Sequence, residues 1–159
     1  MAIKEGDKLP DATLYVMEGG KPTPKKTADL FAGKKVVVFA VPGAYTPTCS
    51  QAHLPGFVVN ADAIKGKGVD SIVCISVNDA FVMDSWGKDK NAEEIIMAGD
   101  GNGEFTKAIG LEMDGSGFGL GKRSQRYAMI VEDGVVTKLS VEAPGQFEVS
   151  KAEAILAAL

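Results

Sequence analysis

Short runs of β-branched and aliphatic residues, separated by polar stretches, predict buried strands along the chain. Residues 34–41 read K-K-V-V-V-F-A-V and residues 71–77 read S-I-V-C-I-S-V. Uninterrupted apolar runs of this length are typical of strands that are covered on both faces. A weaker pattern predicts a third strand over 93–98. Residues 127–131 and 134–141 flank E-D-G, which predicts a hairpin.

Helical patterns fill the intervals between these strands. The longest runs from Pro47 to Lys65, and Pro55-Gly56 must kink or interrupt it because proline lacks the N–H that a helix needs. A further helix over 79–88 follows Asn78, a plausible N-cap. The other predicted helices are 28–33, 103–110 and 149–159, while 112–124 is expected to be an irregular loop.

Strands that alternate with helices, followed by a hairpin and a last helix, indicate an α/β sandwich with a mixed sheet. A length of 159 residues predicts a single domain over 1–159, and no repeat or linker interrupts it. A chain of this size buries roughly two thirds of its unfolded surface, so it needs no disulfides for stability.

Charge and composition exclude several classes of partner. The net charge of -4 and the pI near 5.0 argue against nucleic acid or an anionic membrane. No apolar run reaches the roughly 18 residues of a membrane span, and the start M-A-I-K-E-G-D lacks a signal peptide's apolar segment, so a cytoplasmic protein is expected. Two cysteines and one histidine leave a tetrahedral zinc site a ligand short. We therefore expect neither a metal nor another cofactor.

The stretch V-P-G-A-Y-T-P-T-C-S, residues 41–50, carries the candidate chemistry. Thr46 is a candidate N-cap and Pro47 a candidate first helical residue, which places Cys49 in the first turn. Free N–H groups and the helix dipole favour a thiolate there. The carboxyl end of a strand that leads into a helix is also where open α/β folds bind ligands. The alternative is that Cys49 is a small apolar residue in a capped helix.

A family resemblance separates these interpretations. P-G-A-Y-T-P-T-C matches the P-x-x-x-T-x-x-C signature of the peroxiredoxins, and C-S-Q-A-H-L-P-G-F, G-V-D-S-I-V-C-I-S-V-N-D-A-F-V-M and R-Y-A-M-I-V resemble the type II (atypical) subfamily. The resemblance extends from about residue 3 to the end of the chain. It implies a thioredoxin-like three-layer sandwich, with a central mixed β-sheet flanked by helices. It also implies thiol-dependent reduction of hydrogen peroxide and organic hydroperoxides.

The resemblance assigns roles to individual residues. Cys49 would be the peroxidatic cysteine, within reach of solvent peroxide, which attacks one peroxide oxygen and becomes a sulfenic acid. The hydroxyl of Thr46 would contact the thiolate and the peroxide, and Pro42 would shield the sulfur from water. Arg126 would stabilise the thiolate and polarise the O–O bond. Arg123 matches no family position, so we interpret it as a solvated charge at the rim.

The second cysteine has two interpretations. Cys74 lies within S-I-V-C-I-S-V, where a buried cysteine can simply pack. Type II members from plants carry a cysteine in this context, so Cys74 can instead be a resolving thiol, provided that it comes within disulfide distance of Cys49. Otherwise an external thiol must act, either glutathione with glutaredoxin or thioredoxin. The resemblance also implies a homodimer, with Tyr45 and Phe81 as candidate interface residues.

Three other functions remain to be weighed. His53 lies four residues after Cys49, as in a cysteine–histidine hydrolase dyad, although the family motif treats it as part of the helix. A thiol–disulfide oxidoreductase normally has C-x-x-C, and here Thr46 stands in the partner's place. A non-catalytic redox sensor begins with the same sulfenic acid as a peroxidase, so the sequence leaves it open.

Overall fold

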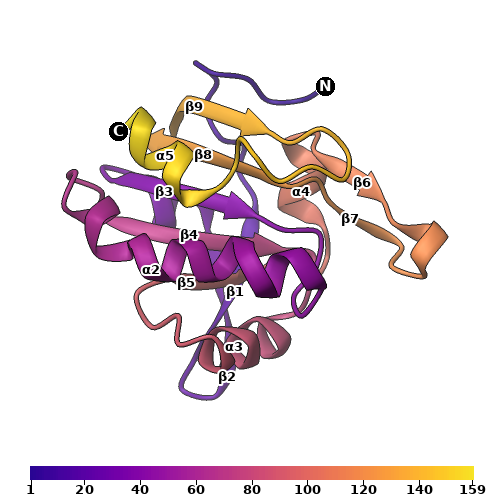
Figure 1. The fold of residues 1–159 in the computed structure, drawn as a ribbon. Helices are drawn as coiled ribbons and strands as arrows, with labels where there is room; N and C mark the ends of the chain where they lie inside the picture. The colour runs from indigo at the N-terminus through magenta and orange to yellow at the C-terminus, as the bar shows by residue number, and fades with distance from the viewer.

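A computed structural model describes residues 1–159 and shows a mixed seven-stranded sheet (Figure 1). The strand order is β2-β1-β5-β4-β3-β8-β9, in which β3, β4 and β5 run parallel and every other pairing is antiparallel. The strands are β1 (Thr13–Glu18), β2 (Lys21–Lys26), β3 (Lys35–Ala40), β4 (Ser71–Ser76), β5 (Ile96–Gly99), β8 (Tyr127–Glu132) and β9 (Val135–Val141).

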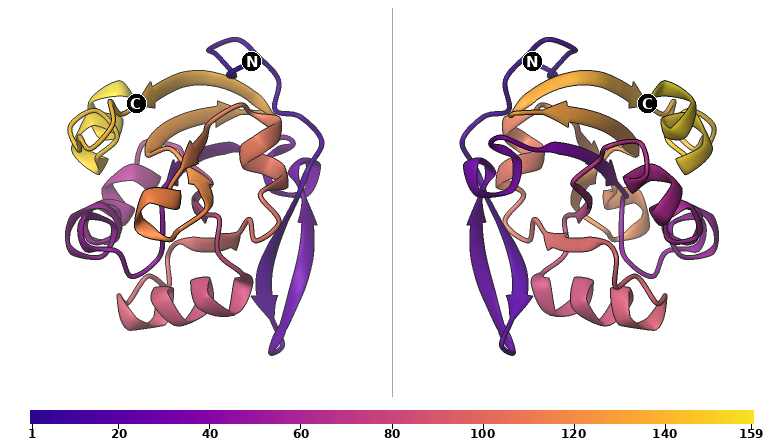
Figure 2. Two further views of the ribbon diagram at one scale, coloured as in Figure 1. Left: turned by 90° about the vertical axis from the view of Figure 1, so that its right-hand side faces the viewer. Right: turned by 90° about the vertical axis from the view of Figure 1, so that its left-hand side faces the viewer.

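Helices cover both faces of this sheet, as Figures 1 and 2 show. One layer contains α2 (Leu54–Lys65), α3 (Ala80–Asp89) and α5 (Ala152–Ala158), and the other contains α1 (Thr27–Phe31) and α4 (Glu104–Ala108). Alternate residues of β3 feed the two cores, because successive side chains of a strand point to opposite faces. Phe39 packs in the core with α2, whereas Val38 packs in the core with α4. The predicted three-layer arrangement is confirmed.

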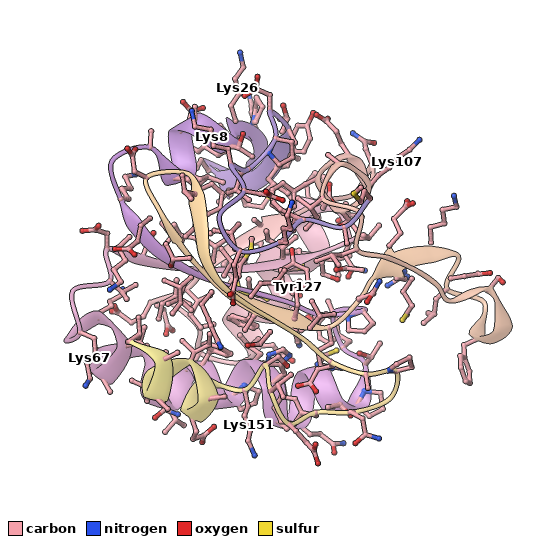
Figure 3. All side chains as sticks on the ribbon, turned by 90° about the horizontal axis from the view of Figure 1, so that it is seen from above. Lys8, Lys26, Lys67, Lys107, Tyr127 and Lys151 are labelled. Atoms are coloured by element: carbon pink, nitrogen blue, oxygen red, sulfur yellow. The ribbon has the colours of Figure 1, made fainter.

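The central strands of the sheet lie deep in the molecule. In Figure 3 the labelled lysines project from the periphery, while Tyr127 at the start of β8 lies near the middle and is fully buried. Arg126 immediately precedes this strand, so its backbone is held beside the core. None of the helices combines the length and apolar character that crossing a bilayer requires.

A hairpin at the edge of the sheet was not among the predicted elements. Strands β1 and β2 pair across Gly19-Gly20. The positive φ angles of these two glycines, 58° and 77°, are those of a two-residue turn that joins the strands of a tight β-hairpin. Strand β2 contains Pro22 and Pro24, which a strand tolerates only at an edge, and β2 is the outermost strand.

The segment 112–124 is more ordered than the predicted irregular loop. Strands β6 (Glu112–Asp114) and β7 (Lys122–Ser124) pair antiparallel and are joined through a short 3₁₀ turn, η2 (Ser116–Phe118). This hairpin projects from the body of the molecule in Figure 1. Because β7 leads into Arg126, the hairpin sets the direction from which that residue enters the site.

The helix that carries Cys49 is interrupted, but earlier than predicted. A π-helical turn, η1 (Cys49–His53), comes immediately before α2, and the N–H of Leu54 donates to the carbonyl of Cys49 five residues back. Pro55 lies in the first turn of α2, where its missing N–H is tolerated. Single π turns inside helices are often found at functional sites, and this one contains the candidate nucleophile.

Candidate active site

Cys49 is the first residue of the π turn η1, which follows the carboxyl end of β3 after a short loop. The first hydrogen bond of the helix joins the N–H of Ser50 to the carbonyl of Thr46 at 2.9 Å, which leaves the N–H of Cys49 among the unpaired donors of a helix start. Its side chain is 0% exposed. The expectation that the sulfur is within reach of solvent is therefore wrong for this conformation, because the surrounding chain covers it.

The guanidinium of Arg126 makes two hydrogen bonds within the site. Its Nη2 donates to Cys49 Sγ at 3.1 Å, and its Nη1 donates to His53 Nδ1 at 2.8 Å. The ring of Phe147 lies against the same group, 5.7 Å from its Cζ atom, a distance at which a cation and an aromatic face attract. Arg126 thus presents a fixed positive charge to the sulfur.

His53 positions the guanidinium and does not act as a base toward Cys49. Because arginine can only donate, Nδ1 must accept, and the ring proton lies on Nε2, which donates to the carbonyl of Ser150 at 3.0 Å. Burial, together with the positive charge of Arg126, lowers the pKa of His53 to about 3. The imidazole is therefore neutral at physiological pH, and the hydrolase dyad is not formed. The four-residue spacing between Cys49 and His53 indicated from the sequence that the two side chains lie close together. The role of His53 in orienting Arg126 was not predicted.

Thr46 and Pro42 shape the loop before Cys49. The hydroxyl of Thr46 donates to the carbonyl of Gly43 at 2.7 Å and makes no hydrogen bond to Cys49 Sγ, so the expected contact with the thiolate is absent here. This hydroxyl also does not cap the helix, although Thr46 occupies the N-cap position. Pro42 lies at the mouth of the site, partly buried.

Arg123 is not the solvated rim charge that was expected. It is partly buried, and its Nη1 donates to the carbonyl of Pro42 at 3.2 Å while its Nε donates to that of Leu120 at 3.0 Å. A Cβ atom on Gly43 would lie 2.7 Å from the same Nη1, closer than packing permits. Arg123 therefore ties the loop of Pro42 to the β6–β7 hairpin, and Gly43 is the residue that lets it approach.

A pocket of about 450 Å³ opens beside these groups. Arg126 lines it and Cys49 does not, so the pocket does not reach the buried sulfur in this conformation. One wall comes from the segment that follows β9. The lining residues are Pro42, Thr48, Glu112, Met113, Gln125, Arg126, Glu142, Ala143, Pro144, Gly145 and Gln146.

Cys74 lies in the middle of β4 and is fully buried. Its side chain belongs to the same core as Cys49, and both thiols are free. Burial, and then the neighbouring Cys49, raise the pKa of the Cys74 thiol. No three His, Cys, Asp or Glu side chains form a group able to hold a metal ion.

Comparisons with known proteins agree with this geometry. A family model described as Redoxin matches residues 4–156. Peroxiredoxin-2E, chloroplastic, of Arabidopsis thaliana is 51% identical over 163 residues, which cover 99% of this chain and 70% of that protein. Peroxiredoxin-2B of the same plant is 47% identical over 159 residues, with 99% and 98% covered. The chain belongs to the peroxiredoxins.

A solved structure supports the same assignment for this peroxiredoxin. Reduced Prx3 from Vibrio vulnificus in complex with hydrogen peroxide is 62% identical, and 98% of each chain superposes with a TM-score of 0.95. The peroxiredoxin therefore has the thioredoxin-like fold and is a thiol peroxidase, which acts on peroxides and needs a thiol reductant.

The state of His53 predicts how the protein responds to pH. Below about pH 6.5 the unfolded chain binds a proton that the folded chain does not bind until about pH 3. The free energy of unfolding should therefore fall as the pH falls, by up to about 1.4 kcal/mol per pH unit from this group. Urea unfolding between pH 6.5 and 5, where few carboxylates titrate, should show this slope in the wild type and lose it in His53→Gln.

The same group can be observed directly, because the chain has a single histidine. NMR of the folded protein should show imidazole signals that stay constant from pH 8 to pH 5, with the proton on Nε2. A titration with a midpoint near 6.5 would contradict the buried neutral state.

Proposed function

We propose that Cys49 is the peroxidatic cysteine of this thiol peroxidase and that Arg126, Thr46 and Pro42 complete its site. The observation that carries the proposal is the 3.1 Å hydrogen bond from Arg126 Nη2 to Cys49 Sγ. Two cysteines are present, yet only Cys49 has a cationic donor against its sulfur. A guanidinium in this position stabilises a thiolate, which is the form of cysteine that attacks peroxides.

The reaction follows from these groups. The thiolate attacks one peroxide oxygen, the O–O bond breaks, and its electron pair leaves with the second oxygen, which takes up a proton and departs as water or an alcohol. Cys49 becomes a sulfenic acid. A reductant thiol then condenses with it, which releases water and forms a mixed disulfide. A second thiol attacks that disulfide and returns Cys49 to the reduced form.

Ionisation of the thiol supplies only a small part of the rate. A free cysteine is already a few per cent thiolate at pH 7, so complete ionisation gains about 30-fold, or roughly 2 kcal/mol of barrier. A more acidic thiol is also a weaker nucleophile. The larger share must come from holding the O–O bond in line with Sγ and stabilising the departing oxygen. We assign this role to Arg126, the N–H of Cys49 and the hydroxyl of Thr46, after it rotates away from Gly43.

We propose that an external thiol, rather than Cys74, reduces the sulfenic acid. Cys74 is buried in the middle of a strand, and burial keeps its thiol protonated by raising its pKa. Glutathione with glutaredoxin, or thioredoxin, would supply the electrons through the mouth beside Pro42. Two free thiols suit a reducing compartment, and we propose the cytoplasm.

We propose further that the protein forms a homodimer through the surface around Tyr45 and Phe81. Their side chains are 49% and 57% exposed, which is high for large aromatic residues. The hydroxyl of Tyr45 lies 2.8 Å from Ser85 Oγ of α3, so the loop before Cys49 and the helix of Phe81 form one continuous surface. Burying this surface against a second copy would also brace the site.

Turnover with a defined reductant tests the proposed nucleophile. Wild type and Cys74→Ser should each consume many equivalents of hydrogen peroxide in excess dithiothreitol, whereas Cys49→Ser should consume none. A fall to one turnover for Cys74→Ser with a thioredoxin system would contradict external resolution. Peroxide consumption by Cys49→Ser at the wild-type rate would remove Cys49 from the mechanism.

Loss of the guanidinium should reduce the rate by more than the ionisation gain. Arg126→Met should lower the second-order rate constant for hydrogen peroxide by well over about 30-fold, because it also removes the donor to the departing oxygen. Stopped-flow fluorescence of Trp86, which lies near the site, can follow the reaction. The control is Lys138→Met, which removes an exposed positive charge from β9 and should leave the rate unchanged. Equal rates for both variants would refute the role of Arg126.

The dimer can be tested by introducing a charge at its proposed centre. Phe81→Asp should convert the protein to a monomer in sedimentation velocity, because an unpaired carboxylate is costly to bury. Val59→Asp is the matched control: Val59 is 82% exposed on α2, an element outside the proposed surface, and the substitution should leave the dimer intact. A wild-type chain that sediments as a monomer at micromolar concentration would exclude the dimer.

A further inference from the structure

Glu142 has an unusual environment for a carboxylate, immediately after β9. It is buried, with 7% exposure, although the residues that follow it from 143 to 146 are all exposed. A single oxygen, Oε2, accepts hydrogen bonds from the N–H of Glu148 at 2.8 Å, the N–H of Ser150 at 2.8 Å and the hydroxyl of Ser150 at 2.7 Å. One side chain thereby closes the loop 143–150 onto itself.

The atoms held by Glu142 lead directly to the site. The carbonyl of Ser150, whose N–H and hydroxyl bind Glu142, accepts from His53 Nε2 at 3.0 Å. His53 Nδ1 in turn accepts from Arg126, which donates to Cys49. The same loop carries Phe147, whose ring lies 5.0 Å from that of His53 and covers the guanidinium. Hydrogen bonds of ordinary length thus join five residues in series, from Glu142 through Ser150, His53 and Arg126 to Cys49.

The backbone of Glu142 adds a second connection. Its N–H donates to the carbonyl of Arg126 at 2.9 Å, which extends the β8–β9 pairing by one step. Both residues line the pocket. Their side chains nevertheless form no ion pair, because the carboxylate is occupied by the loop. The guanidinium therefore keeps both of its observed contacts, with His53 and Cys49.

The charge of Glu142 agrees with this arrangement. Burial alone would raise the pKa of Glu142, but the hydrogen bonds from Ser150 and Glu148 outweigh burial, so the pKa is lowered. An ionised acceptor makes stronger hydrogen bonds than a neutral one. Charge-assisted hydrogen bonds to Glu142 thus hold the loop, in addition to the packing of Phe147 on His53.

We propose that Glu142 is a positioning residue of the peroxidase: by fixing the loop 143–150, it orients Ser150, His53 and Arg126 so that the guanidinium faces Cys49. This inference rests on the proposed function of Cys49. Glu142 does not touch the reacting atoms. It acts by fixing the carbonyl of Ser150 to which His53 Nε2 donates. The ring proton is then held on Nε2, and Nδ1 is left to accept the hydrogen bond from Arg126.

The experiment compares Glu142→Ala and Glu142→Gln with Glu148→Ala, which removes a carboxylate from an exposed position of the same loop. Each variant is assayed for its second-order rate with hydrogen peroxide, and the Nε2 proton of His53 is followed by NMR. We expect Glu142→Ala to slow the reaction by between about tenfold and a hundredfold, since misplaced catalytic groups lose that much. Its Nε2 proton should exchange rapidly. Glu142→Gln, which keeps an acceptor but no charge, should fall between Glu142→Ala and wild type.

The outcomes separate the two levels of the hypothesis. If Glu142→Ala matches Glu148→Ala in rate and in the His53 signal, the positioning role is wrong. If Glu142→Ala fails to fold, Glu142→Gln and Ser150→Ala, which removes one of the three donors, provide the same comparison, and wild-type behaviour in both would overturn the proposal. If peroxide turnover does not depend on Cys49, the proposed function fails, while the His53 signal still reports whether Glu142 orders the loop.

Discussion

The contact between Arg126 and Cys49 joins two segments that are 77 residues apart in the chain. The sulfur is buried, and the charged group that faces it is partly buried, so this cation must itself be held by partners that satisfy its donors. His53 accepts from the guanidinium and orients it from the π turn that also carries the sulfur. The arrangement of the sheet edge, the π turn and the last loop serves to keep these three side chains together.

The sheet explains why these segments meet. Strand β3 pairs with β8 so that Ala40 lies opposite Tyr127, and Arg126 therefore enters beside the chain that leads to Pro42. The parallel pair β3–β4 leaves the carboxyl end of β3 open at the same edge, where ligands bind in open α/β sheets. Arg123 of β7 donates to the carbonyl of Pro42 and so anchors that residue to the hairpin. The register of two strands thus places the guanidinium of Arg126, and the hairpin before β8 holds the loop of Pro42.

Much of this could be predicted from the sequence, because buried strands are apolar runs and the signature around Cys49 is local. The N-terminal hairpin had a readable signal in Gly19-Gly20, but the prolines of β2 argued against a strand until its edge position was known. The roles of His53 and Arg123 depend on carbonyls of Ser150 and Pro42 that are distant in the chain. The burial of Cys49 depends in the same way on tertiary contacts, so no local pattern could show it.

The covered sulfur has a consequence for which molecules can modify it. Sγ is fully buried, and the neighbouring pocket is lined by Arg126 and Pro42 but not by Cys49, so a reagent reaches the sulfur only when the covering residues move. A compact oxidant needs only a small displacement of these residues, whereas a bulky alkylating agent needs a much larger one. Burial of Sγ should therefore favour small reagents, and resistance of the thiol to large electrophiles is compatible with fast chemistry toward small ones.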